Sequence, residues 1–517
     1  MWVDDDRAAE AYRRGLWVRS TLADALRDAA RSTPDRTVLI DGAVRVDCRT
    51  LHERASALAH ALMDRMPPGS VVSFMLPNWY EAAVIYLAAT LAGMVVNPIL
   101  PSLRDRELGF ILSDANSRAV FIPAGFGNHD YVAMLDRVTA DMPAPPEVVV
   151  LRGDAGRHTA YESLFTGGGT VGLPVLNPDA VRMILYTSGT TGRPKGVLHS
   201  HNSIHALIAQ IGEHWMVDAG DVFLVPSPIA HIGGSIYAFE CPLLLGTTAV
   251  LMQRWDPDAA VQLMQTERCT HMAGATPFLV SLLGAAEKAA TRLPDLKVFI
   301  CGGASVPPSL IRSAAAYFER AAVSRVYGST EVPVTTVGAL GDIGHAADTD
   351  GRAGFADIEL HDGEIQARGP QMLVGYLHAD DETDAFDDRG YFRTGDLGRW
   401  VDDTFLVVTG RAKDIIIRNG ENISPKEIED ILIAHPGIAE IAVVGVPDAR
   451  TGERACAVIV AADQPAPDVA ELGHLLTGEG VAKFKIPEQV EVWDALPKND
   501  AGKVLKHRIR ERLMTCK

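Results

Sequence analysis

Hydrophobic positions along this chain alternate between short runs of β-branched residues and longer stretches in which apolar residues recur at helical spacing. From about residue 21 to about residue 400, this alternation predicts parallel β-sheets covered by helices. Asn202 is expected to cap one of the helices, because apolar residues follow it at positions 204, 207, 208, 211 and 215. Candidate strands cover residues 71–75, 181–185, 222–225, 298–301 and 324–327.

The most apolar run covers residues 82–100, and Gly93, Asn97 and Pro98 interrupt it. A membrane-spanning helix needs a longer uninterrupted apolar run, so this segment is predicted to be a buried helix that leads into a strand. No membrane span is therefore expected.

The pattern changes beyond Arg411, where a compact run of about a hundred residues has its own predicted helix at 425–435 and strands at 440–444 and 456–460. This run indicates a separate small α+β domain. The predicted fold class is α/β, with a large multi-layer N-terminal domain (residues 1–410) and a small, mobile C-terminal domain (residues 411–517).

Composition narrows the function classes. Of 517 residues, 47% are hydrophobic and 22% are charged, which is typical of a well-packed globular protein. The net charge of −18 argues against nucleic acid or an anionic membrane surface as the main partner. The six cysteines include no CxxC pair, and the N-terminus is acidic where an export signal would be basic, so a cytoplasmic protein without disulfides or zinc is expected.

Residues 187–196, here called the phosphate loop, read T-S-G-T-T-G-R-P-K-G. Glycines let backbone N–H groups approach phosphate oxygens closely, hydroxyls add donors, and Lys195 adds a mobile positive charge, so the loop predicts ATP-dependent chemistry. It is not a Walker A loop, in which the lysine is followed by Ser or Thr. The predicted donors beside Lys195 are Thr187, Ser188, Gly189, Thr190 and Thr191.

Two acidic residues lie in further motifs. Glu331 ends the run Y-G-S-T-E after a predicted strand, so it is expected at a carboxyl edge of the sheet, either holding Mg²⁺ beside a polyphosphate or serving as the first residue of a helix. Asp396 ends Y-F-R-T-G-D, where an aspartate can form an ordinary glycine turn or accept hydrogen bonds from ribose hydroxyls.

Six motifs in this order resemble the adenylate-forming superfamily, which contains acyl-CoA synthetases, firefly luciferase and the adenylation domains of peptide synthetases. The resemblance covers residues 22–510, and its other motifs are G-E-I-Q-A-R-G-P, the stretch from G-R-A-K-D to P-K-E-I-E, and P-K-N-D-A-G-K. It implies that ATP, Mg²⁺ and a carboxylic acid bind the large domain and that the small domain swings over them. The implied nucleotide site consists of the phosphate loop residues named above, with Glu331 at Mg²⁺, Thr330 near the α-phosphate, Asp396 and Arg411 at the ribose, and Tyr327 and Gly328 beside them.

The reaction implied by the resemblance is attack of a carboxylate oxygen on the α-phosphorus of ATP, with magnesium pyrophosphate leaving. The two reactants are anions, and Lys503 is implied as the catalytic lysine, with Thr190, Glu331 and His231 as further catalytic residues. Such electrostatic stabilisation contributes roughly 3–4 kcal/mol per group. From the residues alone, the favoured interpretation of Lys503 is a solvated lysine of the basic tail. Lys413 falls at the implied hinge between the domains, where an ordinary linker lysine is the alternative.

The acyl pocket is implied at His231, Ile232 and Gly233, together with Gly303, Ala304 and Gly328. The segment offers no carboxylate or amide, and burying an unpaired polar group costs about 1–3 kcal/mol, so an apolar acid is expected. The glycines at these positions and at Gly234 are expected to leave room for a bulky group. Medium-chain, alicyclic, aromatic and steroid-derived acids all stay open.

Coenzyme A is the expected acceptor, because the chain ends soon after Lys503 without a carrier-protein domain. One departure from the family pattern bears on this: Asn419 stands before Gly420 where relatives have two glycines. Two alternatives stay open, an acyl-AMP ligase that loads a separate carrier protein and a non-catalytic nucleotide-binding homologue. The expected partners are a small carboxylic acid, ATP and coenzyme A, and a homodimer is compatible with the sequence.

Overall fold

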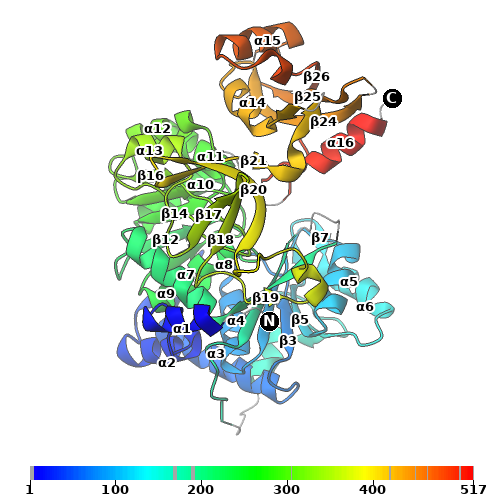
Figure 1. The fold of residues 1–517 in the computed structure, drawn as a ribbon. Helices are drawn as coiled ribbons and strands as arrows, with labels where there is room; N and C mark the ends of the chain where they lie inside the picture. Colours follow the sequence, from blue (N-terminus) through cyan, green and yellow to red (C-terminus); the bar gives the residue numbers. More distant parts are fainter. Residues whose placement is uncertain are drawn as a thin grey trace.

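The structure, a computed structural model, describes residues 5–166, 172–187, 193–303, 306–418, 421–448, 450–462, 464–499 and 502–515. A large body with two extensive sheets lies below a smaller body formed by the C-terminal part of the chain (Figure 1). The predicted α/β class, with a large N-terminal and a small C-terminal domain, is confirmed; the boundary at residue 410 and the mobility stay predictions. Of the predicted site residues, Ser188, Gly189, Thr190, Thr191 and Ala304 lie outside the described part.

The first sheet of the large body has seven strands in the order β16-β15-β14-β12-β13-β1-β2. Its strands are parallel except at the β1–β2 edge, so their carboxyl ends meet at one side of the sheet, where open α/β sheets bind ligands. The strands are β1 (Thr37–Asp41), β2 (Val44–Asp47), β12 (Val222–Val225), β13 (Thr248–Leu251), β14 (His271–Gly274), β15 (Val298–Cys301) and β16 (Ala322–Arg325).

The second sheet has eight strands in the order β19-β11-β10-β4-β3-β5-β8-β9. It is parallel from β10 to β9, whereas β10, β11 and β19 pair antiparallel at the other edge. The strands are β3 (Val71–Phe74), β4 (Val95–Pro98), β5 (Ser117–Pro123), β8 (Glu147–Leu151), β9 (Thr159–Ala160), β10 (Val181–Thr187), β11 (Lys195–Ser200) and β19 (Gly375–Tyr376). A separate two-stranded pair consists of β6 (Gly125–Phe126) and β7 (His129–Asp130).

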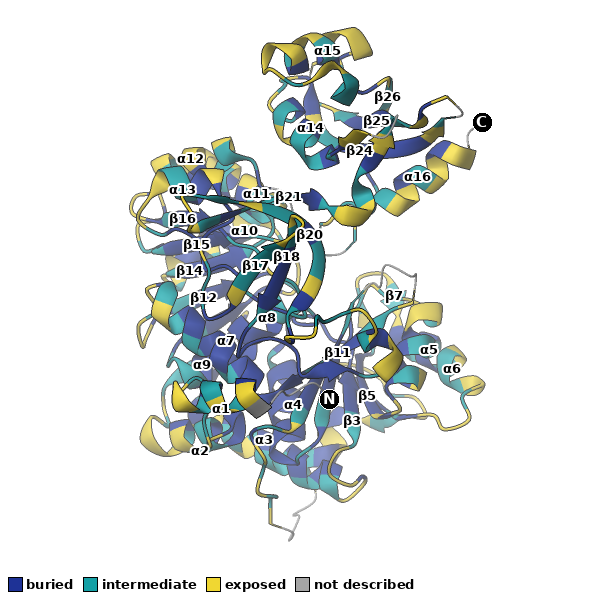
Figure 2. Ribbon diagram, in the orientation of Figure 1, coloured by how far each residue is buried: buried dark blue, intermediate teal, exposed yellow. Residues whose placement is uncertain are grey.

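Helices form layers between and outside the two sheets. One core cluster joins Phe74 and Met183 of the second sheet to Phe223 and Ile300 of the first, with α3, α4 and α7 between them. Further clusters pack α10, α11 and α12 on the first sheet and α5 and α6 on the second. Figure 2 shows the resulting pattern, in which the sheets are buried and the outer helices expose one face. The bounds are α2 (Leu22–Ser32), α3 (Cys48–Met63), α4 (Tyr80–Leu91), α5 (Asp105–Asp114), α6 (Tyr131–Ala140), α7 (His201–His214), α8 (Ile232–Ser235), α9 (Cys241–Leu244), α10 (Pro257–Thr266), α11 (Thr276–Lys288), α12 (Pro308–Tyr317) and α13 (Ile343–Asp348), with a π-helix at Ile236–Glu240 and short 3-10 turns at Tyr161–Phe165 and Ala379–Glu382.

A four-stranded antiparallel sheet departs from the parallel-sheet pattern expected for residues 21–400. It consists of β17 (Asp357–His361), β18 (Glu364–Arg368), β20 (Phe392–Val401) and β21 (Phe405–Arg411). Asp362 and Gly363 both have positive φ between β17 and β18, as do Asp402 and Asp403 between β20 and β21. These are tight hairpin turns, and the Asp-Gly pair at 362–363 is the sequence signal that could have predicted the first one.

The smaller body is built on its own mixed sheet, in which the long strands β24 and β25 pair antiparallel and β26 adds in parallel. Its two faces carry separate apolar clusters, one with α14 and α15 and one with α16, so this body has its own core. Its elements are β22 (Ile416–Arg418), β23 (Glu421–Ile423), α14 (Pro425–Leu432), β24 (Ile438–Asp448), β25 (Gly452–Ala461), α15 (Val469–Gly478), a 3-10 turn at Lys483–Lys485, β26 (Gln489–Val492) and α16 (Lys506–Thr515).

Local predictions hold for some elements and fail for others. The apolar run at 82–100 forms the buried helix α4 and the strand β4, as predicted. The strand expected at 324–327 instead ends at Arg325, because the Tyr327 amide donates to Thr336 Oγ1 at 2.8 Å. Helix α7 is capped by Ser200, whose side chain accepts from the Ser203 amide, and not by Asn202.

The residues before α2 form an N-terminal segment that the hydrophobic pattern did not predict. Helix α1 (Asp5–Arg13) and the following residues lie against the start of α7, because the buried Asn202 side chain accepts from the Val18 amide at 2.8 Å and donates to Tyr12 Oη at 2.9 Å. Trp17 is buried and donates to the Pro370 carbonyl at 3.0 Å. Asn202 is therefore used for tertiary contacts, which explains why it does not cap α7.

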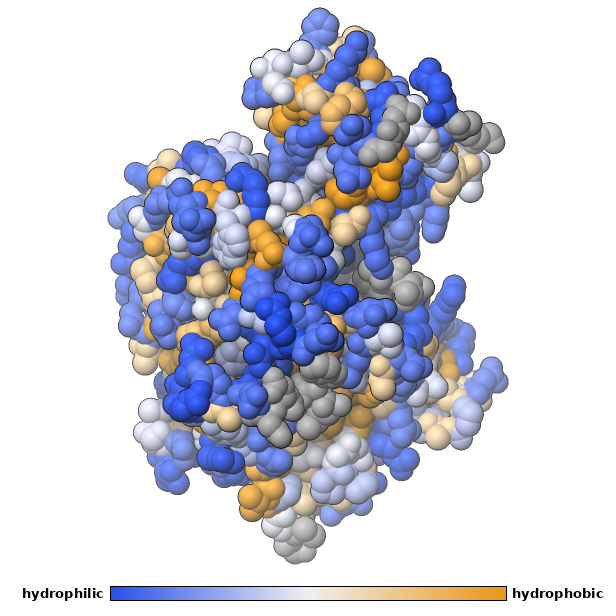
Figure 3. Space-filling model, in the orientation of Figure 1, coloured by the Kyte–Doolittle hydropathy of each residue, from blue (hydrophilic) through white to orange (hydrophobic). Residues whose placement is uncertain are grey.

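Among the described residues, none of the helices has the length and apolar character needed to cross a membrane. The face drawn in Figure 3 is largely hydrophilic. The exposed large hydrophobic residues of the described part come from separate elements, such as Val44, Val280 and Ile417.

Candidate active site

The phosphate loop joins two antiparallel strands at the edge of the second sheet. Thr187 is the last residue of β10, Lys195 is the first residue of β11, and the two residues pair directly across the hairpin. A Walker A loop leads from a strand into a helix, so this connection agrees with the expected difference from that motif. The residues between them that were predicted to contact phosphate lie outside the described part.

Lys195 is held by an acidic residue that the sequence analysis missed. Its Nζ lies 3.6 Å from Asp381 Oδ1 and 5.2 Å from the centroid of the Tyr376 ring. Arg193, also in the phosphate loop, donates from Nη2 to both carboxylate oxygens of Asp381 at 2.8 Å. Asp381 therefore balances the positive charge of the phosphate loop, and nothing in its local sequence marked it for that role.

Tyr376 contacts both Glu331 and Lys195. The Tyr376 hydroxyl donates to Glu331 Oε1 at 3.2 Å, and the Glu331 carbonyl accepts from the Leu373 amide at 2.7 Å. The structure thus brings together a lysine and a carboxylate that are far apart in sequence. Among the described residues there is no cluster of three or more metal-binding side chains, but a single carboxylate fits Mg²⁺ when phosphate and water supply the other ligands.

Asp396, Arg411 and Tyr327 form a hydrogen-bonded triad. Asp396 and Arg411 face each other across β20 and β21, Arg411 Nε donates to Asp396 Oδ1 at 2.6 Å, and Tyr327 Oη donates to Asp396 Oδ2 at 2.7 Å. Burial raises the pKa of Tyr327, and the Asp396 charge raises it further, so the phenol stays protonated and donates. Three residues predicted from different motifs are therefore in direct contact.

Lys503 belongs to the loop before α16 and is exposed, yet it lies among charged groups of the large body. Partial desolvation by the surrounding protein lowers the pKa of Lys503, and the Arg411 charge lowers it further. The charges of Asp396, Asp414 and Glu331 act in the opposite direction and raise it. A lysine in a gap between two bodies can be reached by water and still be partly desolvated. The neighbouring Gly502 lies at such a junction, since a Cβ there would be 3.5 Å from Pro277 Cγ at the start of α11.

The predicted hinge residue, Lys413, is exposed in a short 3-10 turn at Ala412–Asp414. This turn joins β21 of the large body to β22 of the smaller one. Asp414 accepts from Arg510 Nη2 of α16 at 2.9 Å, so the turn is tied to the smaller body.

The predicted pocket residues lie after the carboxyl ends of neighbouring parallel strands. His231 precedes α8, which starts at Ile232, and Gly303 and Gly328 follow β15 and β16. A Cβ at Gly233 or Gly303 would meet nothing within 4 Å, so these glycines leave open space, as expected.

The other two glycines do not leave room, which corrects the prediction. A Cβ at Gly234 would lie 2.1 Å from the Pro228 carbonyl oxygen, and one at Gly328 would lie 2.6 Å from the Val334 amide nitrogen. Both positions need glycine because another backbone segment approaches closely. The loop before His231 is fixed by the buried Asn78, another residue without a sequence signal, which donates to the Val225 and Ser227 carbonyls at 3.0 and 2.9 Å.

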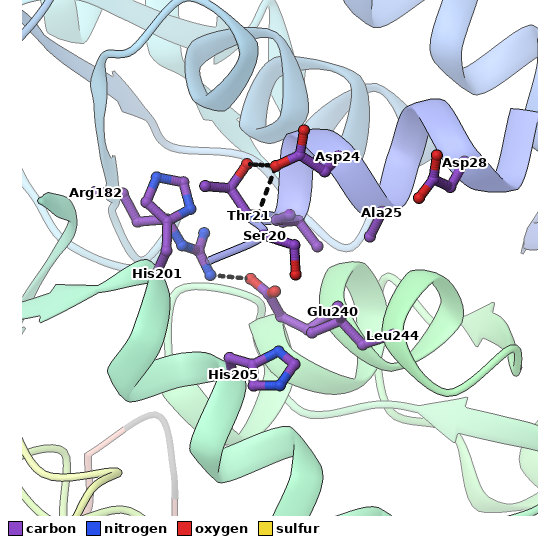
Figure 4. Close-up of a pocket in the computed structure, with 11 residues that line it drawn as sticks. Ser20, Thr21, Asp24, Ala25, Asp28, Arg182, His201, His205, Glu240 and Leu244 are labelled. Carbon is purple, nitrogen blue, oxygen red and sulfur yellow. Dashed lines mark hydrogen bonds and ion pairs between the residues drawn. The ribbon is translucent and has the colours of Figure 1, made fainter. Parts of the chain in front are cut away.

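A polar cavity of about 140 Å³ lies elsewhere in the large body, next to α2, α7 and the π-helix (Figure 4). Arg182 of β10 forms an ion pair there with Glu240, and both side chains are buried. Tyr86 Oη also donates to Glu240 and accepts from Arg182 Nη1 at 2.8 Å. Its described lining consists of Ser20, Thr21, Leu22, Asp24, Ala25, Asp28, Arg182, His201, His205, Glu240 and Leu244, so it is separate from the predicted ATP and acyl residues.

These features define a two-body α/β protein in which Tyr376 contacts both Lys195 and Glu331 at the antiparallel edge of the second sheet, and in which Lys503 of the smaller body lies near charged groups of the large body. Comparison with known proteins agrees. The family model described as AMP-binding enzyme matches residues 26–377, and the model described as AMP-binding enzyme C-terminal domain matches residues 427–503.

Individual relatives match nearly end to end. The medium-chain fatty-acid–CoA ligase of Escherichia coli (strain K12) is 33% identical over 536 residues, with 99% of this chain and 94% of that one covered. The 2,3-dihydroxybenzoate-AMP ligase of Bacillus subtilis (strain 168) is 31% identical over 538 residues, with 98% and 96% covered. ATP-bound MatB from Rhodopseudomonas palustris is a solved structure with a TM-score of 0.84 and 28% identity, with 96% and 99% covered.

The chain belongs to the AMP-binding enzyme family. The predicted membership of the adenylate-forming superfamily, and with it the class of AMP-forming acid–thiol ligase that binds ATP, is confirmed.

Proposed function

We propose that this ligase converts an apolar carboxylic acid and ATP to an acyl-adenylate and pyrophosphate, and then transfers the acyl group to the thiol of coenzyme A, releasing AMP. The observation that supports this most directly is the position of Lys503. Lys503 of the smaller body follows Gly502, which lies against Pro277 of the large body, and the charges of Glu331 and Asp396, where Mg²⁺ and the ribose are proposed to bind, act on its pKa.

The phosphates of ATP would bind the phosphate loop, where Lys195 is available on β11. Lys195 and Arg193 share the Asp381 carboxylate in the present structure, so phosphate oxygens would compete with that carboxylate for Lys195. Glu331 supplies the carboxylate for Mg²⁺, and Tyr376 orients it through the hydrogen bond at 3.2 Å. A magnesium ion held there would neutralise charge on the departing pyrophosphate.

The ribose would bind at Asp396. This carboxylate already accepts from Arg411 and Tyr327, and each carboxylate oxygen has a second lone-pair direction for a ribose hydroxyl. Arg411 and Tyr327 fix the carboxylate in place, so little side-chain entropy would be lost on binding.

Lys503 would act at the α-phosphate. Its ammonium neutralises negative charge as the carboxylate oxygen attacks phosphorus and the bond to pyrophosphate breaks. In the second half-reaction the coenzyme A thiol gives its proton to solvent, its sulfur attacks the acyl carbon and AMP leaves, so no enzyme nucleophile is required. The five described cysteines are buried free thiols, which fits this mechanism and a reducing cytoplasm.

We assign the domain boundary and the hinge to the turn at Ala412–Asp414, with Lys413 at its centre. Rotation there would move Lys503 away after adenylation and present another face of the smaller body to coenzyme A. A Lys413→Pro variant should adenylate but make thioester slowly, and unchanged thioester formation would refute the hinge.

An apolar acyl group is favoured because open space lies beside Gly233 and Gly303, and Ile232 packs against the apolar core. The name of the fatty-acid ligase relative also supports this class of acid. The 2,3-dihydroxybenzoate-AMP ligase relative supports the alternative product, a free acyl-adenylate for a separate acceptor.

A panel of medium-chain, alicyclic, aromatic and steroid-derived acids, assayed for ATP-dependent pyrophosphate release with and without coenzyme A, tests the proposal. We expect release with apolar acids, and acyl-CoA with AMP only when coenzyme A is added. Lys503→Ala should lose adenylation and still form thioester from supplied acyl-adenylate. Equal loss of both half-reactions would contradict the role of Lys503, and no release with any acid would refute the proposed function.

A further inference from the structure

His199 is a fully buried histidine on β11, the strand that begins with Lys195. Its Nε2 lies 2.8 Å from the Thr330 carbonyl oxygen, and its Nδ1 lies 3.1 Å from Ser203 Oγ in the first turn of α7. The imidazole therefore connects the strand of the phosphate loop with the residue immediately before Glu331.

The contacts fix which nitrogen carries the proton. A carbonyl oxygen can only accept, so Nε2–H donates to Thr330, and the unprotonated Nδ1 faces the Ser203 hydroxyl, which also contacts the Ser200 carbonyl at 3.2 Å. Burial lowers the pKa of His199 to about 4, with the nearby Arg182 and Arg7 charges acting in the same direction and the Thr330 carbonyl opposing them. The ring is therefore neutral at physiological pH, and it has no capacity left for proton transfer in this arrangement.

The other anchors of Glu331 also depend on β11. Tyr376, which donates to the Glu331 carboxylate, lies on β19 and pairs with Val197 of β11. Leu373, whose amide donates to the Glu331 carbonyl, lies just before β19. His199 of β11 reaches across to the Thr330 carbonyl, and it lies four residues after Lys195.

We propose that His199 is a positioning residue for the reaction with Mg²⁺ and ATP: its neutral imidazole sets the position of Thr330 and Glu331 relative to Lys195. The proposal rests on the proposed function, in which Lys195 meets the phosphates and Glu331 the metal. Without the Nε2–H donor, the Thr330 carbonyl loses its partner and the loop is free to shift. A shift of this loop would weaken metal and nucleotide binding before it affects the acyl pocket.

The test compares His199→Gln with His199→Asn. A glutamine amide reaches about as far as Nε2 and can still donate to Thr330, whereas the shorter asparagine amide reaches only toward Ser203. We expect the asparagine variant to raise the Mg²⁺ activation constant and the KM for ATP about tenfold, the size expected from one lost buried hydrogen bond. The glutamine variant should stay within about threefold of wild type, and the KM for the acid should change less than about twofold in both.

The matched control is His271→Asn. His271 is also buried on a strand, with Nε2 2.9 Å from the Trp215 carbonyl oxygen and Nδ1 2.8 Å from Thr270 Oγ1, but it belongs to β14 in the other sheet. It should lower the melting temperature as much as His199→Asn does and leave the Mg²⁺ and ATP constants unchanged. If both asparagine variants have a lower melting temperature and neither changes the Mg²⁺ activation constant or the KM for ATP, His199 has a structural role only and the proposal is wrong.

A binding measurement separates this proposal from the proposed function. The increase in melting temperature that Mg²⁺ and ATP cause, compared with ATP in EDTA, requires no turnover. A smaller increase in His199→Asn than in His199→Gln supports the positioning role even if no acid in the panel is a substrate. An equal increase in wild type and both variants overturns it, whether or not pyrophosphate is released.

Discussion

Two regions of this molecule each combine a carboxylate, an arginine and a tyrosine, with different consequences. In the base triad, the Glu240 carboxylate accepts from Arg182 and Tyr86. In the junction triad, the Asp396 carboxylate accepts from Arg411 and Tyr327. The ion pair of the base triad is almost completely buried, with side-chain exposures of 2% for Arg182 and 1% for Glu240. In the ion pair of the junction triad, Arg411 is 42% exposed and Asp396 is 10% exposed.

Position in the fold, and not residue type, separates the two triads. The base triad joins α4, β10 and the π-helix within the large body, beside the cavity of Figure 4. The junction triad joins the antiparallel sheet to the residues after β16, and Arg411 immediately precedes the proposed hinge. A carboxylate with an arginine and a tyrosine can thus be a structural support or a ligand site, and access for a ligand decides which.

The largest effect is expected from Glu240→Gln. The substitution leaves the Arg182 charge buried without its counter-ion, and breaking a buried pair this way costs about 3–5 kcal/mol. We expect a large drop in the melting temperature and an unchanged KM for ATP in the fraction that stays folded.

A double variant, Glu240→Gln with Arg182→Met, removes the uncompensated charge and should recover part of the stability. If Glu240→Gln lowered the free energy of unfolding by less than about 1 kcal/mol, the base triad would contribute no more stability than a surface ion pair. The distinction between the two triads would then fail.

The next effect belongs to the junction triad. Asp396→Asn replaces a charged acceptor for the proposed ribose hydroxyls with a neutral one, and hydrogen bonds to charged groups are worth about 1.5–3 kcal/mol. We therefore expect kcat/KM for ATP to fall roughly 10- to 150-fold, with a change in stability below about 1 kcal/mol because Arg411 can turn to water. Pyrophosphate release and thermal melting measure the two quantities.

Asp362→Asn is the matched control for Asp396→Asn. Asp362 lies in the exposed hairpin turn of the same antiparallel sheet, and asparagine tolerates its positive φ. Asp362→Asn should change neither kcat/KM for ATP nor the melting temperature. If Asp396→Asn destabilises the protein strongly and leaves kcat/KM unchanged, the junction triad is structural as well.

The tyrosines allow a finer comparison. Tyr86→Phe removes a hydroxyl that donates to Glu240 and accepts from Arg182 in the core, so we expect a loss of about 1–2 kcal/mol in stability and no kinetic effect. Tyr327→Phe removes one of two donors that fix Asp396 and should raise the KM for ATP by roughly threefold to tenfold. Parallel melting curves and ATP titrations decide between these outcomes, and the same phenotype in both variants would contradict the comparison.

The sequence analysis named Asp396, Arg411 and Tyr327 through the family resemblance, because each stands in one of the shared motifs. It named no residue of the base triad, and the reason is physical. Arg182 and Glu240 are 58 residues apart, on a strand and a π-helix, and no local pattern links them. Tertiary partners of this kind, including Asp381 beside Lys195, can be identified only once the three-dimensional fold is known.

The same reasoning applies to the fold. The strands at Val222–Val225 and Val298–Cys301 have the bounds predicted from their apolar runs, because buried parallel strands are nearly continuous in apolar residues. The strands at Asp357–His361 and Glu364–Arg368 alternate polar and apolar residues, and the sequence analysis named no strand there. Asn202 is a residue type that often caps helices, but its side chain accepts from the Val18 amide of the N-terminal segment. That contact could not be predicted from the spacing of residues in the sequence.

The smallest effect is a pH dependence of Lys503, whose pKa is influenced by the Arg411 and Asp396 charges of the junction triad. Lys503 must be protonated to act, and the surrounding protein and Arg411 lower its pKa below that of an ordinary lysine, against Asp396, Asp414 and Glu331. The active fraction therefore falls as pH rises through this lowered pKa, so adenylation should decline at a lower alkaline pH than for a free lysine. Asp414→Asn removes one charge that raises the pKa and should move the decline to lower pH, whereas Glu240→Gln should not move it. Lys503→Arg keeps its charge at all these pH values and should abolish the decline; a decline that persists in this variant would assign it to another group.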